Sequence, residues 1–193
     1  ANPDQKTILI ENAFEEINGT NENDVIYGTV SGDLIYAYNG DDTIRGLAGP
    51  DTVYGGEGAD TLYGDGGDDT LLGGDGNDTI MTGLGSDTVF GSLGDDIITV
   101  DGSGNKEIYG GPGMDSLVIS TAGYTSMSDF KVTGSSSDFF TLTSKTSGDT
   151  IKFNGIESIT VGSQSYIYSD GEFPNANVGS PLPSNSGNFF WGA

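Results

Sequence analysis

The residues of this chain best suited to chemistry are aspartates that recur every nine positions. They take the sixth place in consecutive nine-residue units that run through residues 19–118. Two places later each unit carries an apolar residue that favours β structure, and most units begin with glycine. Self-similarity at a short fixed period indicates a repeat architecture. The aspartates of the series are Asp24, Asp33, Asp42, Asp51, Asp60, Asp69, Asp78, Asp87, Asp96 and Asp115.

Stacking of these units would bring like-charged carboxylates within a few ångströms of one another. Their repulsion favours a hard, oxygen-seeking cation between successive turns. Ca²⁺ tolerates an irregular shell of carboxylate and carbonyl oxygens, whereas Mg²⁺ demands near-octahedral geometry. The pattern therefore predicts Ca²⁺ sites whose ligands are the aspartates and free glycine carbonyls. The glycines at the fourth place are Gly40, Gly49, Gly58, Gly67, Gly76, Gly85, Gly94 and Gly113.

Two kinds of element must position these ligands. The first six residues of a unit are rich in Gly, Asp and Asn and predict a turn, because glycine takes backbone angles that other residues avoid. The last three predict a short strand whose middle side chain points inward. Two units make one coil with a turn on each edge, and stacked coils bury a continuous apolar column. The expected fold class is therefore all-β, a solenoid of parallel strands.

Odd and even units fall on opposite edges of this solenoid. An ion needs a turn on either side, so six aspartate-bearing turns on one edge predict about five ions and four on the other predict about three. Glu22 and Ser31 replace the fourth-place glycine in the first two units, which weakens those turns. The expected total is about 6–8 Ca²⁺ ions. One edge carries Asp24, Asp42, Asp60, Asp78, Asp96 and Asp115, and the other carries Asp33, Asp51, Asp69 and Asp87.

The unit that ends at Tyr109 departs from the pattern. Val100 is a one-residue insertion, and Lys106 takes the place of the aspartate. Two interpretations stay open. The ammonium group could replace a cation by offsetting Asp87 on the neighbouring turn, or Lys106 could point into solvent from a degenerate coil. Both predict that no Ca²⁺ binds at this place.

Composition excludes several classes of function. Lys and Arg total 6 against 29 Asp and Glu, a net charge of −23, which disfavours nucleic acid and anionic membranes. The chain has no Cys and no His, so it lacks disulfides, thiolate sites, His-ligated zinc sites and Ser-His-Asp machinery, and we expect no enzyme. No apolar run approaches the ~20 residues of a membrane span. Strong acidity predicts that the metal-free chain is largely unfolded and that metal binding supplies the free energy of folding.

Three units read in full as Gly-Gly-x-Gly-x-Asp, at residues 55–60, 73–78 and 110–115. They resemble the nonapeptide of the RTX (repeat-in-toxin) family, Gly-Gly-x-Gly-x-Asp-x-apolar-x. The resemblance implies a parallel β-roll with Ca²⁺ between turns, export by a bacterial type I secretion apparatus, and folding triggered by extracellular calcium. The expected function is then a calcium-binding module of a larger exported adhesin or exoenzyme, joined to neighbouring domains and secreted or held at the cell surface.

The segments that flank the repeats predict caps. Residues 1–18 carry apolar side chains that would cover the first coil, and residues 119–168 alternate in a way that predicts short antiparallel strands. Within them, Gly155-Ile156-Glu157 resembles a segment found after many RTX rolls, which implies a C-terminal capping structure. An open roll end needs such an apolar lid in any case. Residues 169–193 are rich in Pro, Asn, Ser and Gly, and either a secretion signal or a flexible linker fits them.

The ninth residue of each unit should point outward, opposite to the buried eighth. On one sheet these residues form an aromatic and apolar ladder spaced about 4.8 Å apart. One interpretation is that they only stabilise the strands. The alternative is a ligand- or self-binding face covered by the tail, the cap, a second copy or a sugar. The possible binding face consists of Tyr36, Tyr54, Leu72, Phe90 and Tyr109.

Overall fold

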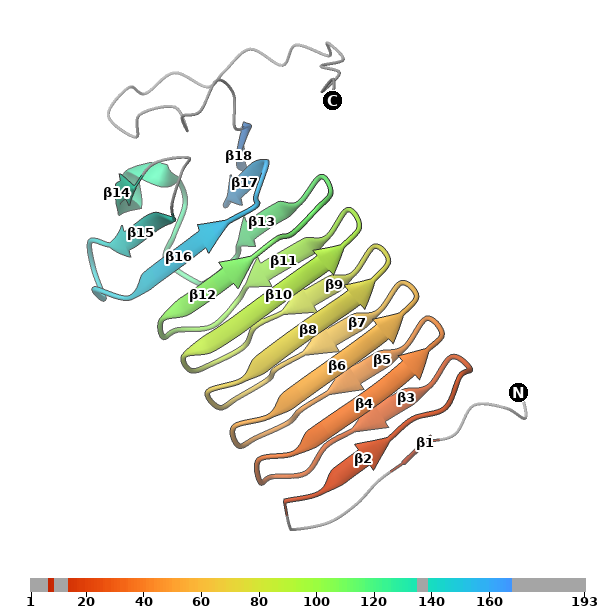
Figure 1. The fold of residues 1–193 in the computed structure, drawn as a ribbon. Helices are drawn as coiled ribbons and strands as arrows, with labels where there is room; N and C mark the ends of the chain where they lie inside the picture. Colours follow the sequence, from red (N-terminus) through yellow and green to blue (C-terminus); the bar gives the residue numbers. More distant parts are fainter. Residues whose placement is uncertain (1–6, 9–13, 135–138, 168–193) are drawn as a thin grey trace.

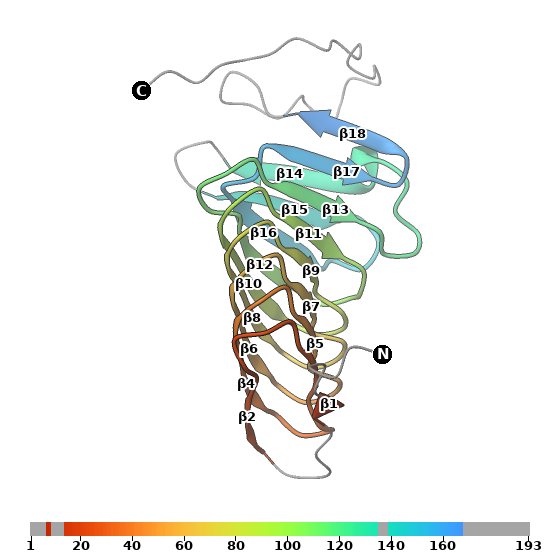
Figure 2. The same cartoon turned by 90° about the vertical axis from the view of Figure 1, so that its right-hand side faces the viewer.

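The structure is a computed structural model that describes residues 7–8, 14–134 and 139–167. Most of the predicted N-terminal cap and all of the predicted tail, 169–193, lie outside these residues. Within them the fold is a roll of two facing nine-stranded sheets (Figures 1 and 2). The chain alternates between the sheets, so each pair of strands makes one coil. The predicted all-β parallel roll is confirmed.

Both sheets of the roll are parallel from coil to coil. The first contains β1 (Thr7–Ile8), β3 (Val25–Tyr27), β5 (Thr43–Arg45), β7 (Thr61–Tyr63), β9 (Thr79–Met81), β11 (Ile97–Val100) and β13 (Ser116–Ile119). The second contains β2 (Glu16–Asn18), β4 (Leu34–Asn39), β6 (Thr52–Glu57), β8 (Thr70–Asp75), β10 (Asp87–Leu93) and β12 (Lys106–Tyr109). Ile35 pairs with Val53 and Val53 with Leu71, so one full coil separates partners. This register stacks identical places of the repeat.

The core is a narrow column of inward side chains. The eighth residue of every unit, from Ile26 to Leu117, is 0% exposed. Strand alternation explains this, because only the middle residue of a three-residue strand points between the sheets. Each strand therefore contributes little apolar area, and the roll depends on its turns for the rest of its stability.

Glycine at the fourth place of the turn is a geometric requirement. At Gly58 the backbone has φ +132°, and a Cβ there would lie 2.0 Å from the carbonyl oxygen of Gly40 on the preceding coil. Only glycine combines this angle with so close an approach. The turns of consecutive coils therefore pack backbone against backbone, and this packing aligns the carbonyl groups of one edge.

The sheets continue beyond the last regular unit. As predicted, antiparallel strands follow: β14 (Phe130–Gly134) and β15 (Phe140–Ser144) pair antiparallel, and β15 pairs with β16 (Thr150–Asn154) in the same way. β17 (Ser158–Val161) likewise pairs with β18 (Gln164–Ile167). A short 3₁₀ helix, Met127–Asp129, precedes them.

Two parallel pairings in this region were missed from the sequence. β16 lies parallel to β12, and β17 lies parallel to β13, so residues 150–161 add another coil to the roll. Ile151, Phe153 and Ile159 continue the buried column, which is the physical reason for the pairing. The period of nine is interrupted between them and the repeats, so periodicity did not reveal it. The domain boundaries drawn from the sequence stay predictions.

Met127, Phe130 and Leu142 are buried in the same apolar cluster as the column. They close the C-terminal end of the roll, as a lid must. In the part of the chain that the structure describes, no helix is long and apolar enough to cross a membrane.

Candidate metal centre

All ten aspartates of the series are buried, none more than 2% exposed. Nine of them lie directly before a strand, and Asp87 begins β10. In the eight from Asp42 to Asp115, Oδ1 accepts a hydrogen bond from the backbone N–H of the aspartate one coil earlier, at 2.7–3.0 Å. The bonds join Asp24, Asp42, Asp60, Asp78, Asp96 and Asp115 on one edge, and Asp33, Asp51, Asp69 and Asp87 on the other. The predicted division of the aspartates between two edges is therefore observed.

The second carboxylate oxygen of most aspartates has no protein partner. A buried acceptor without a partner is costly, and a buried charge without a partner costs more. Glycine at the first place of the turn lets the backbone come close to this oxygen, because it has no side chain: a Cβ on Gly55 would lie 2.5 Å from Asp60 Oδ2. The unpaired oxygens are Oδ2 of Asp42, Asp51, Asp60, Asp69, Asp78, Asp96 and Asp115, and Oδ1 of Asp24.

Lys106 shows what these oxygens are arranged to hold. Its side chain is fully buried, and its ammonium group donates to Asp87 Oδ2 at 2.6 Å. It also donates to the carbonyl oxygens of Gly83 at 2.9 Å, Gly85 at 2.6 Å and Ser103 at 3.3 Å. One carboxylate and three backbone carbonyls therefore surround this cation, and these are the oxygen ligands that Ca²⁺ prefers. Of the two interpretations of Lys106, the structure supports the replacement of a cation.

The Lys106 contacts identify carbonyls that the sequence did not. Gly85, at the fourth place, was among the predicted ligands. Gly83 and Ser103, at the second place of one turn and the third place of the next, were not; the double glycine that begins complete units was the available signal. The predicted fourth-place glycines all adopt φ between +102° and +153°, as this turn geometry needs. The role of these residues as calcium ligands stays a prediction.

Carboxylates alone do not form the sites. Among the residues that the structure describes, no group of three or more acidic or other side-chain metal ligands gathers around one point. Two aspartates of the same edge flank each interval of the regular units, and around Lys106 backbone carbonyls provide the other contacts. The residues present therefore fit an ion that accepts many carbonyl ligands, which is the chemistry of Ca²⁺ rather than of Zn²⁺.

The first two turns close on themselves. Thr20 donates from its backbone N–H and its hydroxyl to Asp24 Oδ2, at 2.6 and 2.8 Å. Thr29 donates from its N–H to Asp33 Oδ2 at 2.6 Å. These threonines supply hydrogen bonds where later turns have unpaired oxygens, which gives a physical reason for the predicted weakness of the first two units. Threonine at the second place was the signal that sequence reasoning overlooked.

The extra acids at the fifth place bind the next turn instead of a metal. Asp41 Oδ1 accepts from the N–H of Ala59 at 2.9 Å, and Asp68 Oδ1 accepts from Ser86 at 2.8 Å. These side chains lie at the surface, as the sequence interpretation of solvated turn residues requires. They also bind the next turn, so solvation alone does not describe them.

Burial dominates the electrostatics of the aspartates. Removal from water raises the pKa of Asp42 and Asp115 to about 6, of Asp69 and Asp78 to about 7, and of Asp51 to about 8. The backbone hydrogen bond to each carboxylate lowers its pKa in part, and repulsion from charged neighbours on the same edge raises it further. Without a metal, the fold therefore favours protonated carboxyl groups.

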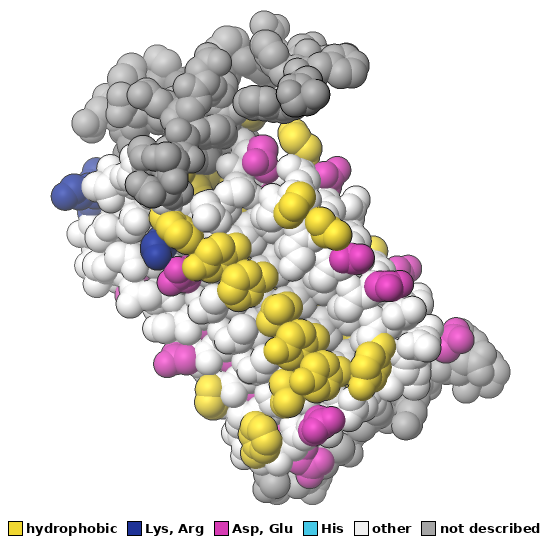
Figure 3. Space-filling view, in the orientation of Figure 1, with side chains coloured by type: hydrophobic (Ala, Val, Ile, Leu, Met, Phe, Trp, Pro, Cys, Tyr) yellow, Lys and Arg dark blue, Asp and Glu magenta, His cyan; other side chains and the backbone are white. Residues whose placement is uncertain are grey.

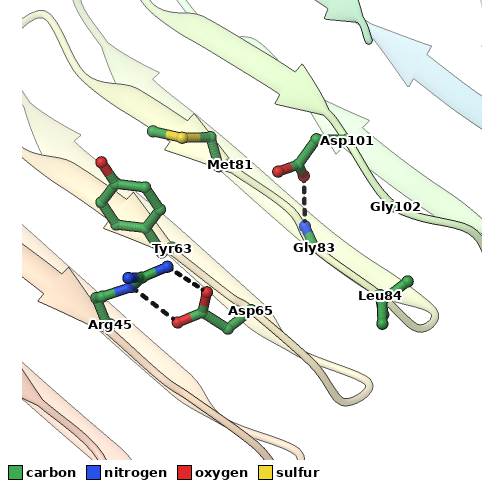
Figure 4. Close-up of a pocket in the computed structure, with 8 residues that line it drawn as sticks. All are labelled: Arg45, Tyr63, Asp65, Met81, Gly83, Leu84, Asp101 and Gly102. Atoms are coloured by element: carbon green, nitrogen blue, oxygen red, sulfur yellow. Dashed lines mark hydrogen bonds and ion pairs between the residues drawn. The ribbon is translucent and has the colours of Figure 1, made fainter. Parts of the chain in front are cut away.

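A cavity of about 250 Å³ lies away from the columns of buried aspartates, on the outer side of β5, β7 and β9 (Figure 4). Arg45 forms a bidentate ion pair with Asp65, at 3.0 and 2.7 Å, and its guanidinium lies 4.6 Å from the ring centre of Tyr63. Asp101 accepts from the N–H of Gly83 at 2.8 Å. The charged groups of the cavity thus satisfy one another or the backbone, and we assign it no chemistry.

The ladder of ninth residues lies on the outer face of β4, β6, β8, β10 and β12, where an apolar stripe follows the sheet (Figure 3). Tyr36 and Tyr54 stack at 4.8 Å, and Phe90 and Tyr109 stack at 4.7 Å. Phe139, from the C-terminal region, meets Tyr109 edge-on at 5.3 Å. The C-terminal region therefore contacts one end of the ladder, while Tyr54 remains exposed.

Together, the roll and its columns of unpaired carboxylate oxygens define a repeat protein whose turns fit cations. Comparison with family models agrees: the RTX calcium-binding nonapeptide repeat matches in four copies, at residues 14–44, 36–71, 63–98 and 72–105. Over residues 14–105 the chain belongs to the RTX calcium-binding repeat family, as the resemblance predicted. No curated protein matches the chain significantly.

The raised pKa values predict how the metal-free protein responds to pH. Asp42, Asp51, Asp69, Asp78 and Asp115 have folded-state pKa values of about 6 to 8, above the ordinary value of 3.8. Their contribution to stability is therefore complete below about pH 4 and is lost as the pH rises through about 6 to 8. We expect calcium-free protein to gain β structure when the pH is lowered from 8 to 4, measured by far-ultraviolet circular dichroism. A spectrum that stays constant over this range would contradict the assigned burial.

The Lys106 site predicts a large effect of a single substitution. Lys106→Met leaves the Asp87 carboxylate buried without a cation and should cost about 3–5 kcal/mol of unfolding free energy, measured by denaturant titration in saturating calcium. Lys106→Asp should recover stability in calcium only, with one additional bound ion. Lys152→Met is the matched control: its ion pair with Glu107 is exposed, so a loss below about 1 kcal/mol is expected. Equal losses for the two methionine variants would exclude the cation role of Lys106.

Proposed function

We propose that this chain is a calcium-binding RTX module that folds on meeting extracellular Ca²⁺ and supports the type I secretion and stability of a larger exported protein, such as an adhesin or exoenzyme. The observation that carries the proposal is the buried, unpaired carboxylate oxygen found in the turns of the regular units. A folded roll without cations would keep these charges unsatisfied, so the fold and the ion are coupled.

The open intervals indicate which residues would hold the ions. On one edge, four intervals begin at Asp42, Asp60, Asp78 and Asp96, each with an unpaired Oδ2 and an aspartate on the next coil. On the other edge, two begin at Asp51 and Asp69. Carbonyls at the second and fourth places of the turn would complete the shell, as they do around Lys106. We therefore expect about six ions in the repeats, the lower end of the predicted range.

Calcium would supply the counter-charge that the chain lacks. The net charge is −23 with only 6 basic residues, and the column of single apolar residues is too thin to offset that repulsion. Binding free energy would then act as folding free energy. The chain contains no Cys, so calcium would also take the stapling role that disulfides have in other exported proteins.

Export in an unfolded state follows from the same coupling. A chain that cannot fold at low calcium stays extended until it reaches the exterior, where extracellular calcium-binding modules in general have Kd values of roughly 10⁻⁴–10⁻³ M. The secretion route, the extracellular location and the parent protein are proposals that rest on membership of the RTX family. A catalytic role is not proposed, because one oxygen of these aspartates accepts a backbone hydrogen bond and the other is directed at the proposed cation position.

The proposal predicts calcium-dependent folding. Removal of Ca²⁺ at pH 7.5 should abolish the β spectrum, and its return should restore it with about six ions bound per chain. Mg²⁺ should restore it poorly, because it requires near-octahedral coordination. Circular dichroism during titration, together with ion counting by native mass spectrometry, tests both points. A β spectrum that persists in excess chelator, or two ions or fewer per folded chain, would refute the coupling.

A second candidate function is self-association through the outer aromatic ladder. The specific observation is that two pairs of its rings stack along the sheet and that the apolar stripe remains on the surface over most of its length. A second copy of the chain would present the same apolar stripe, and pairing would remove both from water.

This candidate predicts a selective loss of association. Replacing Tyr54 and Phe90 together by Ser should reduce dimer formation, measured by sedimentation velocity in calcium, while leaving the number of bound ions unchanged. Tyr27 and Tyr63, replaced together on the opposite sheet, provide the matched control. A wild-type chain that sediments as a monomer at high concentration would show that the ladder only stabilises its strands.

A further inference from the structure

The column of carboxylates on the Asp24 edge does not end at Asp115. The N–H of Asp115 donates to Glu157 Oε2 at 2.7 Å, just as the N–H of Asp96 donates to Asp115 Oδ1 at 2.9 Å. Glu157 lies 42 residues further along the chain and outside the residues matched by the repeat family. It nevertheless takes the position of the next aspartate in the column.

Backbone register supports this equivalence. Ser116 pairs with Ser158 and Leu117 with Ile159, so Glu157 comes directly before its strand, as the aspartates do. The N–H of Gly110 donates to the carbonyl of Asn154 at 3.0 Å, the bond that the first residue of a unit makes to the last residue of the preceding unit on the next coil. Gly155 therefore takes the first place of a turn, and Glu157 takes the sixth.

This turn is shortened from six residues to three, Gly155, Ile156 and Glu157. A shorter turn lies closer to the strands, and a carboxylate at its end must reach further to join the column. Glutamate has one more methylene than aspartate, which provides that reach. The change of residue type and the change of turn length therefore compensate each other.

The space between the two turns has an unsatisfied charge. Asp115 is 0% exposed, and its Oδ2 has no hydrogen-bond partner. The carbonyl oxygen of Gly155 lies beside the same carboxylate, since a Cβ on Gly110 would meet Gly155 O at 1.7 Å and Asp115 Oδ2 at 2.5 Å. Two carboxylates and a carbonyl therefore converge on this interval.

The Lys106 site provides the comparison for the remaining ligands. There the cation contacts the second, fourth and sixth places of one turn, which are Gly83, Gly85 and Asp87. In the turn before Glu157 the same places are Gly111, Gly113 and Asp115. Gly111 and Gly113 have φ of +119° and +153°, within or close to the range of the regular turns. One half of the cation site is therefore complete.

We propose that a Ca²⁺ ion binds between Asp115 and Glu157 and fastens residues 150–161, and the lid that follows the repeats, to the roll. The proposal rests on the proposed calcium-binding function and adds to it a site outside the nonapeptide repeats. The two edges then end in different ways: Lys106 provides a permanent cation on one, and the other needs Ca²⁺. Closure of the C-terminal end would thus depend on calcium even though residues 150–161 lack the repeat motif.

The test uses the full chain with Glu157→Gln. Glutamine keeps an oxygen that can accept from the N–H of Asp115, so a role limited to that hydrogen bond would be preserved. We expect native mass spectrometry to count one Ca²⁺ fewer than in the wild type. At limiting calcium, amide hydrogen exchange in residues 150–161 should become faster by about tenfold or more. Glu107→Gln is the matched control, because it removes one charge from a nearby coil where the carboxylate is paired with Lys152.

A second variant resolves the case in which glutamine disrupts folding. Glu157→Lys should place an ammonium group in the interval, as Lys106 does on the other edge, with one ion fewer and with protection of residues 150–161 that no longer depends on calcium. If both variants bind as many ions as the wild type, the proposal is wrong and Glu157 only extends the hydrogen-bond ladder. Absence of any bound Ca²⁺ in the wild type would instead refute the proposed function itself.

Discussion

The different roles of the two carboxylate oxygens in the buried aspartates from Asp42 onward govern this structure. One oxygen accepts the backbone N–H of the preceding coil, which fixes the spacing and register of the coils. The other is left aimed at the interval between turns, where only a cation or a donor can satisfy it. Because the side chains are removed from water, their charge cannot be offset by solvent. Each interval therefore requires a partner.

The chain meets this requirement in three ways along its length. In the first two turns, Thr20 and Thr29 donate hydrogen bonds to the carboxylates. At the far end of one edge, the ammonium group of Lys106 occupies the interval beside Asp87. Between these ends the turns provide neither, and bound calcium is the proposed partner. The chain therefore supplies its own partners in the first two turns and at the end of the Asp87 edge, and it leaves the other intervals to the environment.

The apolar part of the molecule is subordinate to this arrangement. One or two inward apolar side chains per strand make a continuous but narrow column, which cannot by itself outweigh the repulsion between buried charges. The C-terminal strands add larger side chains, Phe130 and Phe153 among them, and close the column where it would otherwise meet water. The proposed metal binding at the turns and the burial at the lid would therefore be complementary sources of stability in a chain without disulfides.

The sequence by itself determined the roll, the inward column, the two edges and the aspartates on each, because all of these repeat with a period of nine and depend on local alternation. Tertiary structure decided what the period could not encode. It determined that Lys106 turns inward to Asp87, that threonines close the first turns, and that Glu157 joins a column 42 residues behind it. The physical reason is register. β16 and β17 join the roll through long-range parallel pairing, which is driven by inward residues such as Phe153. Because the intervening residues break the period of nine, the sequence carries no signal of which strands these two will pair with.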